Sequence, residues 1–69
     1  MNKENRQQSF SKLEALAKDM NVTCYRLAKE LGLSKSLFSD WKRGKSMPKA
    51  DKLVKIANYF GVSIEYFLE

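Results

Sequence analysis

Histidine is absent from this chain of 69 residues, and cysteine occurs only once. A single cysteine cannot form a disulfide within a monomer, and without histidine it cannot complete a zinc site of the usual kind. The sequence also lacks a glycine-rich phosphate loop, and it has no nucleophile beside a candidate general base. We therefore expect a protein that is not an enzyme and that uses no metal ion, no other cofactor and no small-molecule substrate.

Long hydrophobic stretches are missing as well. No apolar run approaches the roughly 20 residues that a membrane-spanning helix needs, and residues 1–8 lack the apolar segment of a secretory leader. These features predict a cytoplasmic protein without a membrane segment. With 43% hydrophobic and 30% charged residues, the chain has the composition and the length of one small globular domain.

Glycine and proline are scarce, and they stand where helices are expected to end or begin. Residues 20–23, 31–34 and 60–63 share one pattern: an apolar residue, Gly or Asn, a second apolar residue, and Ser or Thr. The second position can turn left-handed after a helix, the third can cover the helix end, and the fourth can cap the next helix through its hydroxyl. The remaining joint, residues 45–49, is longer and basic, and Pro48 restricts the entry to the helix that follows.

These joints divide the chain into five expected helices, and no stretch shows the alternation typical of a β-strand. The expected helices cover residues 9 or 11 to 20, 24–31, 35–43, 50 to 59 or 60, and 64–68. Apolar side chains recur at helical spacing, which predicts a shared core. Its expected members are Phe10, Leu13, Ala17, Met20, Leu27, Ala28, Leu31, Leu37, Phe38, Trp41, Leu53, Ile56, Ala57, Phe60, Phe67 and Leu68. Stacking of Phe38, Trp41 and Phe60 on single-stranded nucleic acid is the alternative, and helical spacing favours the core.

The first eight residues have no apolar pattern after the initial methionine. We therefore expect residues 1–8 to form a flexible tail and residues 9–69 to form the domain. A capping-box pattern at Ser11 supports this start of the first helix. The alternatives are a loose extension of the helix and a basic arm that carries Lys3 and Arg6.

The positive charge is concentrated in the middle of the chain. Thirteen Lys and Arg residues against eight Asp and Glu residues give a net charge of +5. Residues 26–55 contain nine basic and three acidic residues, a net +6, so the remainder carries −1. A phosphate-binding surface needs such a concentration of charge, although a lysine-rich surface that is merely solvated has the same composition.

Ala28, Gly32, Phe38 and Trp41 stand at the spacing of two short helices joined by a tight turn. This pattern resembles the helix-turn-helix of the phage repressor and Cro family, also called the XRE-like or lambda-repressor-like DNA-binding domains. The resemblance continues through residues 39–45, Pro48 and residues 56–63. It covers about residues 10–68, and it implies an all-α, compact five-helix bundle in which the second and third helices form the helix-turn-helix.

The resemblance also implies a transcriptional regulator that binds double-stranded DNA sequence-specifically, as a Cro-like or CI-like repressor of phage or mobile-element type. By resemblance, the base-reading residues of the third helix are Lys35, Ser36, Ser39 and Asp40. Lysine suits the O6 and N7 acceptors of guanine, aspartate can accept from the N4 amine of cytosine, and serine is permissive. The alternative for Lys35 and Asp40 is ordinary solvated polarity, with Asp40 paired locally to Arg43.

Phosphate groups would be bound near both ends of the helix-turn-helix. Thr23 and Cys24 open the second helix, where free backbone N–H groups and the positive end of the helix dipole attract anions. The same position can lower the pKa of the Cys24 thiol. Arg43, Lys45 and Lys49 flank the far end of the third helix, so we expect these five residues to bind phosphate.

One recognition helix reads only a few base pairs, so a homodimer on half-sites about one helical turn apart is expected. Met47, Ile64 and neighbouring residues of the last helix are the expected contact surface between the two copies. The rival interpretation is a protein-interaction module, antitoxin-like or antirepressor, that uses the same fold to bind another protein.

Overall fold

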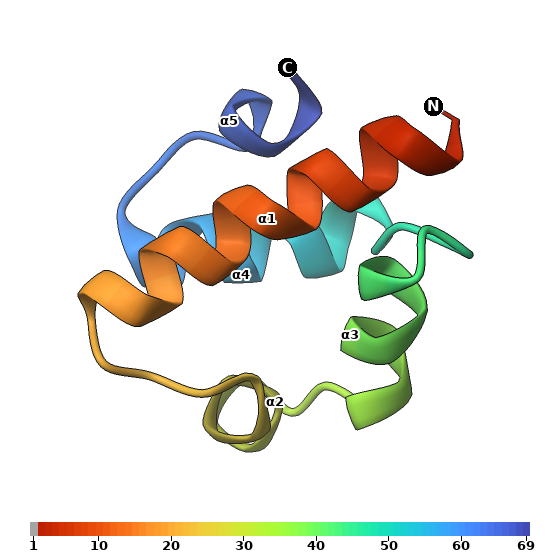
Figure 1. Ribbon diagram of the computed structural model, residues 1–69. Coiled ribbons are helices and arrows are strands. Elements are labelled where there is room, and N and C mark those ends of the chain that lie inside the picture. The colour runs from red at the N-terminus through yellow and green to blue at the C-terminus, as the bar shows by residue number, and fades with distance from the viewer. Residues whose placement is uncertain (1) are drawn as a thin grey trace.

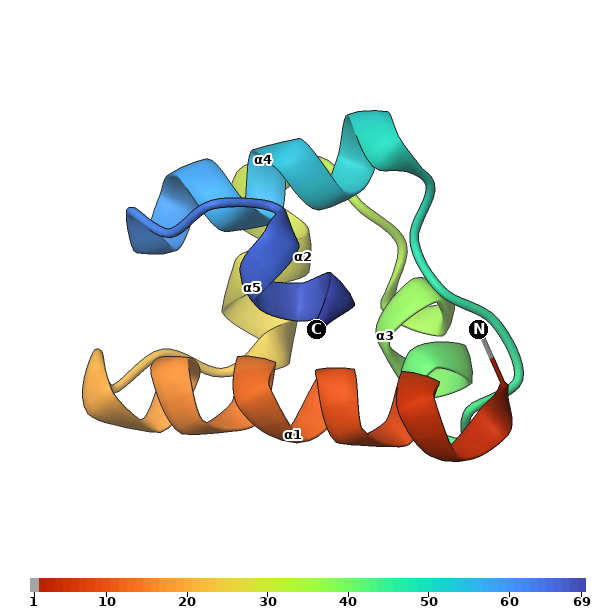
Figure 2. The ribbon, with the colours of Figure 1, turned by 90° about the horizontal axis from the view of Figure 1, so that it is seen from above.

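The computed structural model describes residues 2–69, and within that range it contains five α-helices and no β-strand. The helices are α1 (Lys3–Asp19), α2 (Cys24–Leu31), α3 (Lys35–Lys42), α4 (Ala50–Phe60) and α5 (Glu65–Leu68), labelled in Figure 1. α1 and α4 run along opposite sides of the molecule (Figure 2), and α2 and α5 lie on opposite faces of it (Figure 1). The expected all-α bundle of five helices is confirmed.

Side chains from all five helices meet in one core, and Trp41 of α3 is the largest fully buried side chain among the described residues. The Trp41 side chain is fully buried, and its ring packs edge-on against Phe10 of α1 and Phe67 of α5. The centroid distances are 5.6 Å and 5.9 Å, which are favourable for aromatic pairs. The buried Nε1 of Trp41 has no hydrogen-bond partner among residues 2–69. Burial of its ring area therefore holds Trp41 in place without help from a polar contact.

All four joints between the five helices begin with the same backbone arrangement. A residue with positive φ follows the helix, and the next N–H group donates to a carbonyl five residues back, as in a Schellman motif. The bonds run from Val22 N to Ala17 O (2.8 Å), Leu33 N to Ala28 O (2.8 Å), Lys45 N to Asp40 O (2.8 Å) and Val62 N to Ala57 O (3.0 Å). The joint after α3 is longer, as expected, and it starts with the same turn as the other three.

Side-chain caps form at two of the three positions where the pattern predicts them. Thr23 accepts a hydrogen bond from the backbone N–H of Arg26, and Ser34 accepts one from Leu37. The prediction for Ser63 is wrong, because α5 begins after Ile64 and has no side-chain cap. The first turn of α5 instead uses the Ser63 carbonyl, which accepts from the Tyr66 N–H.

The expected start of the first helix at residue 9 or 11 is wrong. α1 begins at Lys3, and the side chain of Asn2 caps it by accepting from the Asn5 N–H at 2.8 Å. Ser9 lies inside the helix, is buried, and donates its hydroxyl to the Phe67 carbonyl at 2.6 Å. Residues 3–8 therefore belong to α1. Met1, the first residue of the expected tail, lies outside the described residues.

The ends of the apolar stripes also differ from expectation. Met20 was expected in the core but is 49% exposed, because it follows the last turn of α1 and its backbone has left helical geometry. Leu68 was expected there as well and is 50% exposed, because the short α5 turns Phe67 inward. Phe60 is half-buried, and α3 ends at Lys42, one residue before its expected end.

The close approach of α1 to the joint after α3 gives a test of this packing. Gly44 has a φ of +73°, and a Cβ added there would lie 2.8 Å from the carbonyl oxygen of Lys3. Gly61 has nearly the same φ, +70°, and a Cβ there would meet nothing within 4 Å. Gly61→Ala should therefore lower the free energy of unfolding by about 1 kcal/mol, the cost of a left-handed non-glycine residue. Gly44→Ala should cost about 1–3 kcal/mol more, because α1 must move away.

Urea denaturation followed by circular dichroism measures both changes. Equal losses of stability in the two variants would contradict the packing of Gly44 against α1.

Candidate nucleic-acid interface

α3 has one buried and one exposed side. Phe38 and Trp41 point into the core, with exposed fractions of 3% and 0%. Lys35, Ser36 and Ser39 are exposed on the other side. Gly32 adopts a left-handed conformation after α2, and Ser34 caps α3 two residues later, so the turn between the helices is short. The structure therefore has the helix-turn-helix geometry that the sequence predicts, with a polar ridge on α3.

Asp40 is the one member of the expected base-reading set that is partly buried, whereas the other three are exposed. Its carboxylate accepts a hydrogen bond from the Arg43 guanidinium at 2.9 Å. The local pairing that the sequence left open is therefore formed. The Arg43 side chain is 67% exposed, and ion pairs this exposed contribute little to stability. Arg43 can exchange Asp40 for another anion at small cost.

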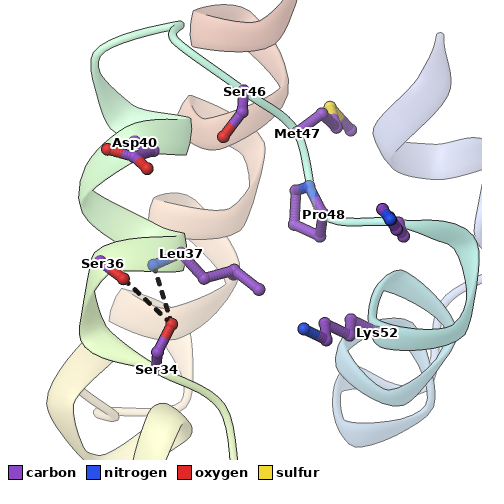
Figure 3. Close-up of a pocket in the computed structure, with 9 residues that line it drawn as sticks. Ser34, Ser36, Leu37, Asp40, Ser46, Met47, Pro48 and Lys52 are labelled. Carbon is purple, nitrogen blue, oxygen red and sulfur yellow. Dashed lines mark hydrogen bonds between the residues drawn. The ribbon is translucent and has the colours of Figure 1, made fainter.

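The first turn of α3 makes side-chain contacts of its own. Ser34 and Ser36 share a hydrogen bond between their hydroxyls at 3.1 Å, drawn in Figure 3. The ammonium group of Lys35 lies over the ring of Tyr25, 4.2 Å from the ring centroid. Tyr25 belongs to α2, so this contact crosses the turn between the two helices.

An open groove of about 250 Å³ separates α3 from the joint that follows it and from the start of α4. Figure 3 shows Leu37 and Lys52 on its two sides. The lining residues are Ser34, Ser36, Leu37, Asp40, Ser46, Met47, Pro48, Lys49 and Lys52. Lys49 was an expected phosphate-binding residue, whereas Lys52 was missed.

The five expected phosphate-binding residues lie at both ends of the helix-turn-helix but do not form one cluster. Thr23 and Cys24 are at the start of α2, and Thr23 uses its hydroxyl oxygen to cap that helix. Arg43, Lys45 and Lys49 are exposed and lie between the end of α3 and the start of α4. Lys49 precedes α4 and forms no side-chain cap for it.

The first turns of α1 support the basic joint after α3. The Arg6 Nε donates to the Gly44 carbonyl at 2.7 Å, and the Lys3 backbone lies against Gly44. Lys3 and Arg6 thus belong to a helix packed on the domain, so a free basic arm is not what the structure shows. The contact restrains the backbone between Arg43 and Lys45.

α2 is tied to α4 by polar contacts at the surface. The Tyr59 hydroxyl donates to a carboxylate oxygen of Glu30 at 2.9 Å, and the Arg26 Nε lies 3.6 Å from the same oxygen. The hydrogen bond to Glu30 is the main reason that the pKa of Tyr59 is raised above its ordinary value. The Tyr59–Glu30 hydrogen bond therefore connects α2 to α4, whereas the Arg26–Glu30 pair lies within α2.

The environment of Cys24 differs from expectation. Burial raises the pKa of its thiol, the carboxylate of Glu14 raises it further, and the ammonium group of Lys42 offsets part of the increase. The expectation that the start of α2 lowers the pKa of this thiol is therefore wrong, because partial burial disfavours the charged thiolate. Residues 2–69 also contain no group of three or more His, Cys, Asp or Glu side chains that could hold a metal ion. None of the helices in that range is long and apolar enough to cross a membrane.

Alkylation of Cys24 by iodoacetamide across a pH series tests this environment. The thiolate is the reactive form, so the midpoint of the rate profile should lie at higher pH in the folded chain than in the chain unfolded in guanidinium chloride. Glu14→Gln should lower the midpoint, and Lys42→Ala should raise it, because these groups act on the thiol with opposite sign. A midpoint that is lower in the folded chain would contradict the burial of this thiol.

Comparison with known proteins supports the geometry. A family model described as Helix-turn-helix matches residues 25–67. Two curated relatives match over 57 residues, 83% of this chain. One is the HTH-type transcriptional activator BcrR of Enterococcus faecalis, which is 35% identical and covered to 28% of its length. Another is the uncharacterized HTH-type transcriptional regulator YobD of Bacillus subtilis (strain 168), which is 33% identical and covered to 51%.

The chain thus spans about half or less of the length of these relatives. No solved structure matches the chain at a significant level. The segment that the family model matches contains nearly all of α2, the whole of α3 and α4, and most of α5. That segment is more than half of the chain and includes the turn and the exposed ridge of α3. The chain belongs to the XRE-like, or lambda-repressor-like, helix-turn-helix family.

Proposed function

We propose that this chain is a transcriptional regulator that binds double-stranded DNA sequence-specifically, with α3 in the major groove. One observation carries the proposal: the ridge of α3 opposite Phe38 and Trp41 is exposed and has cations at its end. A major groove admits an α-helix, and its base edges present distinct patterns of donors and acceptors. Seated on the core by two aromatic side chains, α3 has a fixed orientation in which its polar ridge can meet these edges.

The base-reading set that we propose consists of Lys35, Ser36, Ser39 and Asp40. The three exposed members stand on the ridge of α3, and Asp40 borders the groove beside it. Lys35 would donate to the O6 and N7 atoms of a guanine, and Asp40 would accept from a cytosine amine. In the free chain Asp40 holds Arg43 at 2.9 Å. On DNA, Arg43 would move to a phosphate and leave the Asp40 carboxylate for a base.

The phosphate-binding set consists of Thr23, Cys24, Arg43, Lys45 and Lys49. Thr23 and Cys24 would act through the start of α2, where backbone N–H groups and the helix dipole favour an anion. The three cations would hold the backbone beyond the other end of α3, and Lys52 on the groove wall would add to them. Phosphate contacts of this kind set affinity and register and do not read the sequence.

We propose a homodimer on two half-sites, because the recognition helix of one copy reads only a few base pairs. Two copies would place their α3 helices about 34–36 Å apart, one turn of B-DNA. Met47 and Ile64 are half-buried side chains, and we propose that they and the neighbouring residues of α5 form the contact between copies. Occupancy of an operator by such a dimer would block transcription, so we propose a repressor of phage or mobile-element type acting in the cytoplasm. One relative is named an activator, and the direction of regulation depends on where the operator lies.

Selection of binding sites from random duplexes, followed by shift assays across a salt series, tests the proposal. Wild-type affinity should fall steeply with salt, because phosphate binding releases counterions. Lys35→Ala should lose about 1–3 kcal/mol of discrimination at one base pair. Lys45→Ala should weaken binding to all sequences alike and reduce the salt slope by about one.

Lys12→Gln is the control variant, because it also removes one positive charge from the chain. The Lys12 Nζ donates to the carbonyls of Tyr66 and Glu69, at α5 and just after it. Because α5 and α2 lie on opposite faces of the molecule (Figure 1), the replacement should leave base preference and salt slope unchanged. Duplex binding that is weak and insensitive to salt would favour the rival function, an antitoxin-like or antirepressor module that binds a protein.

A further inference from the structure

Tyr25 is an aromatic residue that the core does not use. It lies in the first turn of α2 and is 58% exposed, more than any other large hydrophobic residue described in this structure. Its ring instead faces the ammonium group of Lys35, whose Nζ is 4.2 Å from the ring centroid. Ten positions separate these residues in the sequence, and the turn between α2 and α3 brings them together.

The contact has the geometry of a cation–π interaction. An ammonium group within about 6 Å of a ring centroid is attracted by the negative face of the ring, and the attraction strengthens when water is excluded. Lysine has a long, flexible side chain with three N–H donors, so one side of the ammonium group can rest on the ring while other donors stay available. The ring itself is carried by a capped helix, because Thr23 caps α2 two residues earlier.

We propose that Tyr25 is a specificity-determining residue that positions Lys35 for base reading. Without the ring, the Lys35 side chain would sample many rotamers and reach several neighbouring acceptors. With the ring in place, its ammonium group is held beside the first turn of α3, so it addresses one base pair. The inference rests on the proposed function, and it assigns to α2 a part in sequence discrimination rather than in phosphate binding alone.

The free protein offers a test that needs no DNA. In the full chain, the face of the Tyr25 ring should shift the ε-methylene proton resonances of Lys35 upfield. The shift should persist in Tyr25→Phe, which keeps the ring, and disappear in Tyr25→Leu, which keeps an apolar side chain without a π face. An unshifted Lys35 in the wild-type chain would overturn the inference.

A second experiment measures how well the variants discriminate between base pairs in duplex DNA. The base pair read by Lys35 is first identified as the one at which Lys35→Ala loses preference. Tyr25→Leu should reduce discrimination at that pair by about three- to tenfold, with an unchanged salt slope. Tyr25→Phe should match the wild type, and Tyr25→Trp should discriminate at least as well, because tryptophan is the best cation–π partner. The double variant of Tyr25→Leu with Lys35→Ala should behave as Lys35→Ala alone.

Two outcomes separate this inference from the proposed function. A wild-type chain that binds no duplex would overturn the proposed function, and the role of Tyr25 in base reading with it. A wild-type chain that binds, but whose discrimination is unchanged by Tyr25→Leu, would overturn the inference alone. Equal losses in Tyr25→Phe and Tyr25→Leu would also overturn it, because the hydroxyl and not the ring would then be the active group.

Discussion

The burial of Trp41 between Phe10 and Phe67 is the interaction on which the rest of this structure depends. It joins α3 to the first and the last helix of the bundle, and it does so without a hydrogen bond to the indole within residues 2–69. Because Trp41 and Phe38 are both held inside, the opposite side of α3 has only one direction to face. The polar ridge is therefore set by packing in the core, and no contact on the ridge itself is needed to orient it.

The joints between the helices also restrain how the neighbouring helices lie relative to α3. Each of the four joints begins with a Schellman-type turn that ends its helix. Three of them lead into the next helix within a few residues, whereas the joint between α3 and α4 spans residues 43–49. α1 adds a second restraint, because Arg6 and the Lys3 backbone hold Gly44 at the end of α3. The cations of the joint after α3, Arg43 and Lys45, are thus carried by a backbone that α1 restrains at Gly44.

Much of the fold could be predicted from the sequence, because the signals were local. The turn at Gly32 and the caps at Thr23 and Ser34 depend on residues within a few positions of one another. The buried face of α3 follows from the spacing of Phe38 and Trp41 in the same way. The start of α1 was missed because its first turns carry no apolar stripe and gain their support from Gly44, 38 residues beyond Arg6. The exposure of Lys35, Ser36 and Ser39 on α3 could be predicted from the spacing of the buried residues. The position of Lys52 could not, because it faces α3 only across a groove.

By itself, the sequence determined which segments are helical, where most of them end, and which face of α3 is buried, since helix periodicity, left-handed turns and hydroxyl caps act over a few residues. Only the tertiary structure decided which partners those faces meet: that Cys24 is partly shielded from water near Glu14, and that Tyr25 lies under Lys35. The physical reason is the distance over which each kind of interaction acts. Desolvation, charge interactions and ring contacts depend on distances in space, and those distances exist only after the core around Trp41 has brought the helices together.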